Sequence, residues 1–103
     1  MDMGSEIFDK NKDLLNDITK RLKIIGHPLR VKILILIQQQ KCKVTVIADC
    51  LKESQPIISQ QIAIMRNAGI IEGSRDKNCI VYKIVDSFCE CVINKVLSTV
   101  DEV

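Results

Sequence analysis

The segment from residue 44 to residue 69, VTVIADCLKESQPIISQQIAIMRNAG, constrains the fold most, because it predicts two short helices joined by a tight turn. Apolar residues recur three and four positions apart in each half, which is the spacing of one buried helical face. Gly69 supplies a C-terminal stop for the second helix. The predicted buried residues are Val44, Ile47, Ala48 and Leu51 in the first helix, and Ile58, Ile62, Met65 and Ala68 in the second.

Ser54 is predicted to cap the second helix, because its hydroxyl can accept a hydrogen bond from a free amide of the first turn. Pro56 lies in that first turn, where its missing N–H costs no hydrogen bond. Two helices joined by so short a turn cross steeply, as in the helix-turn-helix, whose second helix reads the major groove of DNA. An exposed polar face can also bind nothing, so this segment alone leaves both interpretations open.

A β-hairpin is predicted directly after the helix pair. Residues 70–75 and 79–85 are rich in β-prone side chains, and the polar residues Asp76, Lys77 and Asn78 separate them. A helix-turn-helix followed by a hairpin forms a winged helix.

With these pieces in order, the sequence resembles the ArsR/SmtB family of bacterial transcriptional repressors over about residues 20–86. Four segments are similar to the family's motifs: residues 26–34 (GHPLRVKIL), 54–62 (SQPIISQQI), 66–71 (RNAGII) and 81–84 (VYKI). The resemblance implies a two-fold dimer that binds a symmetric double-stranded DNA operator and represses transcription. Release by a signal is also implied, and an unidentified small inducer is a further candidate partner.

The expected DNA contacts lie on the second helix of the pair and on the wing. Glutamine and serine side chains can reach base edges and phosphates, and the cations of the wing can reach phosphates. One departure is that Gln60 and Gln61 stand where the family commonly has an Arg-His pair, and this loss of potential positive charge lowers the expected phosphate affinity. The expected contacts are Ser54, Gln55, Pro56, Ser59, Gln60, Gln61, Arg66, Arg75 and Lys77.

Residues 6–24 are predicted to form one N-terminal helix, which Gly26 ends, and a second helix runs from Pro28 to about residue 40. His27 is expected to be a cap or a packing residue rather than a metal ligand, because a single imidazole defines no site. Arg30 is expected in an internal salt bridge, as the resemblance implies. The predicted fold is therefore a mainly α winged helix with four helices, two strands and a last helix, forming one domain over residues 1–103.

The last helix is predicted to begin with a capping box between Ser87 and Glu90. Its apolar arc is wider than a small domain can cover, so part of it is expected to pack against a second copy together with the first helix. A monomer whose last helix packs within its own chain is the alternative. The expected dimer residues are Ile7, Leu14, Ile18, Phe88, Val92, Val96 and Val100.

Five cysteines, an odd number, indicate reduced thiols rather than a disulfide framework. None of the family's known metal sites has its ligands here, and Cys89 and Cys91 lie about 200° apart around a helix, so no metal site is predicted. Cys50 and Cys79 are expected to be buried as small apolar residues. Cys50, Cys89 and Cys91 are kept as candidates for a thiol sensor that responds to redox state or to metals and metalloids.

The composition limits the function classes. Apolar residues make up 47% of the chain and charged residues 27%, as in a soluble globular protein. No long apolar run and no export signal is present, so a cytoplasmic protein without a membrane partner is expected. No catalytic constellation appears, which predicts a non-enzyme without a cofactor. A winged helix that binds only proteins is the alternative to a DNA-binding regulator, and repression controlled by thiol oxidation is a third interpretation.

Overall fold

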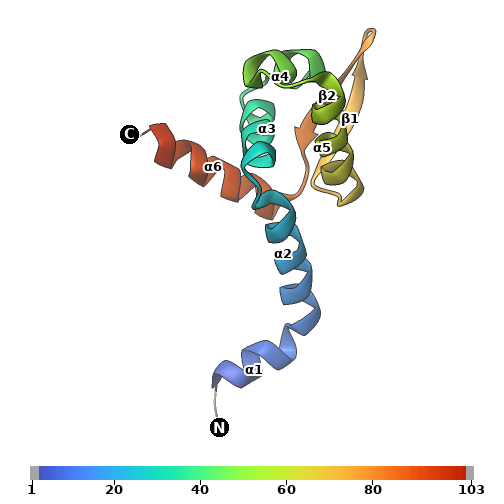
Figure 1. The fold of residues 1–103 in the computed structure, drawn as a ribbon. Helices are drawn as coiled ribbons and strands as arrows, with labels where there is room; N and C mark the ends of the chain where they lie inside the picture. The colour runs from blue at the N-terminus through green and yellow to red at the C-terminus, as the bar shows by residue number, and fades with distance from the viewer. Residues whose placement is uncertain (1–2, 102–103) are drawn as a thin grey trace.

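The computed structural model describes residues 3–101, which form a helical body with a projecting two-stranded wing (Figure 1). The expected mainly α winged-helix fold is confirmed. None of the described helices is long and apolar enough to cross a membrane. The elements are α1 (Met3–Lys10), α2 (Lys12–Ile25), α3 (Pro28–Gln38), α4 (Val44–Leu51), α5 (Gln55–Asn67), β1 (Ile71–Asp76), β2 (Cys79–Ile84) and α6 (Ser87–Asp101).

The N-terminal segment differs from the prediction, because two helices stand where one was expected over residues 6–24. Asn11 separates α1 from α2, with φ −117° and ψ 23°. Its side-chain Nδ2 donates to the carbonyl oxygen of Ile7 at 2.8 Å, and its backbone N–H donates to the same oxygen at 3.1 Å. A short amide side chain that competes for backbone acceptors favours such a break.

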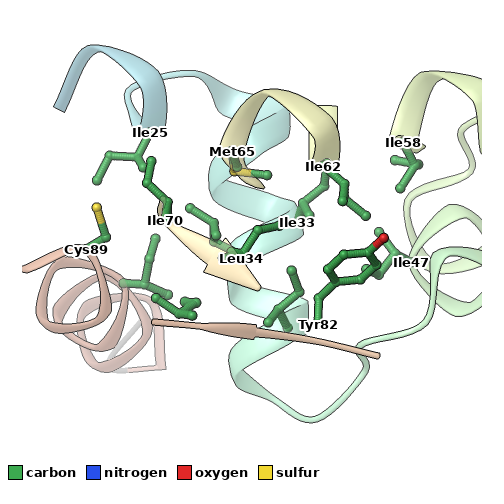
Figure 2. Close-up of a cluster of buried hydrophobic side chains, with 14 of the residues drawn as sticks. Ile25, Ile33, Leu34, Ile47, Ile58, Ile62, Met65, Ile70, Tyr82 and Cys89 are labelled. Atoms are coloured by element: carbon green, nitrogen blue, oxygen red, sulfur yellow. The ribbon is translucent and has the colours of Figure 1, made fainter. Parts of the chain in front are cut away.

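Helix α3 is the centre of the fold and packs against α2, α4, α6 and β2. Its Ile33 and Leu34 are fully buried and lie in the middle of the apolar cluster in Figure 2. His27 occupies the N-cap position of α3, as expected, but its side chain is exposed and makes no capping hydrogen bond. The core consists of Ile25, Ile33, Leu34, Ile37, Ile47, Ala48, Ile58, Ile62, Met65, Ile70, Ile71, Tyr82, Ile84, Cys89 and Ile93.

The chain leaves α5 through Gly69, as the sequence predicts. Gly69 has φ +76°, a left-handed conformation that glycine adopts without a steric penalty. The next amide, that of Ile70, donates to the carbonyl oxygen of Met65 at 3.0 Å, which closes the helix end. This turn leads directly into β1.

Strands β1 and β2 pair antiparallel, from Ile71 opposite Ile84 at the base to Asp76 opposite Cys79 at the tip. Ile71, Tyr82 and Ile84 are buried at the base of the wing, whereas residues 72–80 are exposed. The core therefore anchors one end of the hairpin and leaves the other end in solvent.

The start of α6 is capped by Asp86 rather than by the predicted Ser87–Glu90 box. Asp86 Oδ2 accepts a hydrogen bond from the backbone N–H of Cys89 at 2.9 Å, and Asp86 Oδ1 lies 3.5 Å from Arg21 Nε of α2. Burial by itself raises the pKa of Asp86, but the hydrogen bonds from Cys89 and the charge of Arg21 outweigh it and lower the pKa overall. One carboxylate thus joins α2 to the beginning of α6.

The two ends of the molecule extend away from the body (Figure 1). The radius of gyration is 15.9 Å, compared with about 13 Å for a compact domain of 100 residues. In α6, Phe88 and Val92 pack partly on the chain's own core, so they are less free for a partner than expected, whereas Val100 is 59% exposed. Leu14 of α2 is 54% exposed.

Candidate nucleic-acid interface

The turn between α4 and α5 sets the position of the second helix of the pair. Lys52 follows α4 with φ +55° in the left-handed region, and the N–H of Glu53 donates to the carbonyl oxygen of Ala48 at 3.0 Å. Ser54 then caps α5, because its Oγ accepts from the N–H of Ile57 at 3.4 Å. The predicted cap is confirmed, and a three-residue turn joins the two helices.

Helix α5 buries one face and exposes the other. Ile58, Ile62 and Met65 are in the core, as the spacing predicts. Most of the helix residues expected to contact DNA have exposed side chains, and two isoleucines of the helix, Ile57 and Ile64, are each 39% exposed. The exposed predicted residues of this segment are Ser54, Gln55, Pro56, Ser59, Gln60 and Arg66.

Gln61 is the exception among the residues expected to contact DNA. It is half-buried, and its Oε1 accepts a hydrogen bond from Arg30 Nε at 2.7 Å. Arg30 Nη1 also donates to the carbonyl oxygen of Ile24 at 3.0 Å. The expected internal salt bridge of Arg30 is therefore replaced by hydrogen bonds to two neutral acceptors, and Gln61 serves the contact between α3 and α5.

The wing brings a second group of polar side chains next to α5. Arg75 lies near the end of β1, and Lys77 lies in the turn with φ +58°; both are exposed. Arg66 of α5 and Arg75 line one hollow of about 220 Å³, together with Ser74. The sequence named both arginines as DNA contacts but did not show that they share one hollow.

Gly73 lies opposite Tyr82 in the hairpin and lines this hollow. A Cβ atom on Gly73 would lie 2.9 Å from Cγ2 of Ile80 and 3.0 Å from Cε1 of Tyr82. Because Tyr82 is part of the buried core, its ring has little room to move away. A side chain at position 73 would therefore displace Ile80 or Tyr82.

The protein family described as "bacterial regulatory protein, arsR family" matches residues 27–72, from the N-cap of α3 to the start of β1. The crystal structure of the transcriptional repressor PagR of Bacillus anthracis is 30% identical to this chain, with a TM-score of 0.74. The two superpose over 82% of this chain and 98% of PagR. This chain belongs to the ArsR family.

Two further proteins are similar over most of the chain. The transcriptional repressor SmtB of Mycobacterium tuberculosis is 25% identical over 75 residues, which cover 73% of this chain and 56% of SmtB. The chain thus spans only about half the length of this curated relative. A homodimeric winged helix-turn-helix DNA-binding domain from Mycobacterium bovis is 22% identical, with a TM-score of 0.75 over 91% of this chain and 87% of that domain.

The cysteines of this ArsR-family chain are dispersed. Cys50 and Cys79 are exposed, which contradicts their expected burial, because α4 turns Cys50 away from the core and Cys79 lies at the tip of the wing. Cys91 is also exposed, and all five thiols are free. Among residues 3–101, no group of three His, Cys, Asp or Glu side chains is close enough to hold a metal ion.

Two thiols have raised pKa values. Burial, followed by the hydrogen bond to Asp86 and the negative charge of that residue, raises the pKa of Cys89 to about 12. Burial also raises the pKa of Cys42, whose Sγ donates to the carbonyl oxygen of Ile37 at 3.7 Å. A reactive sensor needs a thiol that is accessible to solvent and ionised near neutral pH. Cys89 is buried and its pKa is raised, so it meets neither requirement.

Proposed function

We propose that this chain is a homodimeric transcriptional repressor that binds double-stranded DNA through α5 and the wing. The observation that carries the proposal is the capped helix α5, whose exposed polar face lies beside a wing with two exposed cations, Arg75 and Lys77. In a winged helix, such a helix enters the major groove and the wing follows the phosphate backbone. Membership of a family of regulatory proteins supports a regulatory rather than a catalytic role.

The proposed dimer rests on apolar side chains that the single chain leaves in solvent. Ile7, Leu14 and Val100 are each more than half exposed, on the helices that extend from the two ends of the body. The similar domain from Mycobacterium bovis is homodimeric, which supports a dimer for this chain. A two-fold dimer would place two copies of α5 about one DNA turn apart, which suits a symmetric operator.

Titration of a labelled DNA duplex tests this function directly. The duplex is taken from the region upstream of the protein's own coding sequence, and fluorescence anisotropy is measured at several salt concentrations. If Arg66, Arg75 and Lys77 of both subunits contact phosphates, the slope of log affinity against log salt should be about −5, from about 0.9 per contact. Absence of salt-dependent binding to any duplex would favour the protein-interaction alternative.

A further inference from the structure

We propose that α5 selects A·T base pairs, with Ile57 and Ile64 contacting thymine methyl groups on either side of an adenine read by Gln60. This inference rests on the proposed DNA binding and specifies which bases the helix recognises. It assigns a role to two exposed isoleucines that the sequence pattern leaves unexplained.

The three residues form one stripe along the exposed side of α5. Ile57, Gln60 and Ile64 are spaced at i, i+3 and i+7, so their side chains lie within about 60° of each other around the helix. The stripe is about 10 Å long, from a rise of 1.5 Å per residue, which equals about three base-pair steps of 3.4 Å. One face of the helix can therefore contact a run of about four base pairs, with Ile57 and Ile64 at its two ends and Gln60 between them.

The chemistry of the stripe matches A·T pairs. Thymine alone among the four DNA bases presents a methyl group in the major groove, and apolar side chains recognise it by contact. A glutamine amide can form two hydrogen bonds with adenine N6 and N7. Ile57 and Ile64 are each 39% exposed, so they keep apolar surface that a methyl group could cover.

Guanine has no comparable partner on this face. Arginine and lysine make the commonest specific contacts to guanine, and residues 55–65 contain neither. The single arginine of α5, Arg66, lies in its last turn and lines the hollow with Arg75 of the wing, which suits a phosphate contact. Gln61 borders the stripe, but its carbonyl oxygen accepts from Arg30, so it lacks the free amide that a bidentate contact to adenine needs.

The first experiment varies the DNA: bound duplexes are selected, and the methyl groups of their thymines are then removed. Duplexes with a randomised centre are selected for binding to the full chain, and the enriched half-sites are expected to carry adenine and thymine at the contacted positions. Each thymine is then replaced by deoxyuridine, which keeps base pairing and lacks only the methyl group. Affinity should fall about fourfold for each contacted methyl that is removed.

The second experiment varies the protein: alanine variants assign each thymine methyl group to one isoleucine. Ile64→Ala should weaken binding to the selected duplex and abolish the effect of deoxyuridine at one thymine, while the effect at the other thymine remains. Ile57→Ala should show the reciprocal pattern. Val85→Ala is the matched control, because Val85 is 41% exposed but lies in the connection between β2 and α6. It should retain full sensitivity at both thymines.

The outcomes separate this inference from the proposed function. Salt-dependent DNA binding with enriched G·C half-sites, or with no response to deoxyuridine, would overturn A·T selection and leave DNA binding intact. If Ile57→Ala and Ile64→Ala respond to deoxyuridine as the parent does, the two isoleucines do not contact methyl groups. Failure to bind any duplex would instead contradict the function on which the inference rests.

Discussion

Gln60 and Gln61 are adjacent in the sequence but have different surroundings. One residue corresponds to a rotation of about 100° around a helix, and this rotation turns Gln61 toward Arg30 while Gln60 remains exposed. The hydrogen bond of 2.7 Å from Arg30 Nε occupies the Gln61 carbonyl oxygen. Only Gln60 of the pair keeps its whole amide available for a base edge.

The thiols should differ in reactivity according to their burial. We expect iodoacetamide at pH 8 to alkylate Cys50, Cys79 and Cys91 in the folded protein and to leave Cys89 unmodified, because burial and Asp86 raise the pKa of Cys89 to about 12. Peptide mass spectrometry measures the modified fraction at each position. In urea, all the cysteines should react, and rapid alkylation of Cys89 without urea would contradict its place in the core.

Lys52 holds a strained position in the turn before α5. Its φ of +55° costs a residue with a Cβ atom about 1–2 kcal/mol, whereas glycine avoids this cost but loses more entropy on folding. Lys52→Gly should therefore raise the free energy of unfolding by about 0.5–1 kcal/mol, measured by urea denaturation. Lys52→Ala keeps the Cβ atom and should show no such gain. Equal effects of the two variants would rule out backbone strain as the cause.

At the scale of elements, the wing is a hairpin that is anchored at one end. Tyr82 and Ile84 are buried at its base, while Arg75 and Lys77 lie toward its exposed tip. Substitutions at the tip can therefore test the proposed DNA contacts without disturbing the core.

The double variant Arg75→Ala/Lys77→Ala should weaken binding to all DNA sequences to a similar extent. Each lost phosphate contact removes about one unit from the slope of log affinity against log salt, so the slope should flatten by about 2 per subunit. The control Lys10→Ala/Lys12→Ala removes the same charge from α1 and α2, far from the wing in Figure 1. A slope equal to that of the parent would exclude the wing from the interface.

At the scale of the whole molecule, the extended shape suits the proposed dimer. The longest dimension is 57 Å, and α1 with the first part of α2 lies away from the helical body (Figure 1). Helices with so little covering from their own chain gain most of their stability from packing against something else. A second copy of the chain would supply that packing on both ends.

Leu14→Asp should break the proposed dimer. Leu14 is 54% exposed in the single chain, so a monomer would tolerate the carboxylate, whereas a two-fold interface would bury two unpaired charges at a cost of several kcal/mol. Sedimentation velocity should show monomers, and specific DNA binding should be lost with the dimer. Asn16→Asp adds the same charge on the opposite side of α2 and should leave the dimer intact. An intact dimer of Leu14→Asp would place the interface elsewhere.

The sequence by itself determined the elements whose signals are local. The Ser54 cap, the Gly69 stop and the apolar spacing of α5 each depend on residues within one or two helical turns, and the structure contains all three. The winged-helix fold followed from the order of these local signals. The family resemblance could be recognised for the same reason, because its motifs lie in continuous segments.

Only the tertiary structure decided which side chains remain free. The spacing of the cysteines did not reveal that Cys50 is exposed and Cys89 is buried, because that depends on how α4 and α6 pack on the core. The sequence pattern does not distinguish Gln61 from Gln60 as a DNA contact. The difference comes from Arg30, 31 positions earlier in the chain, which donates a hydrogen bond to Gln61. Burial and long-range hydrogen bonds are properties of elements packed together, so no local pattern encodes them.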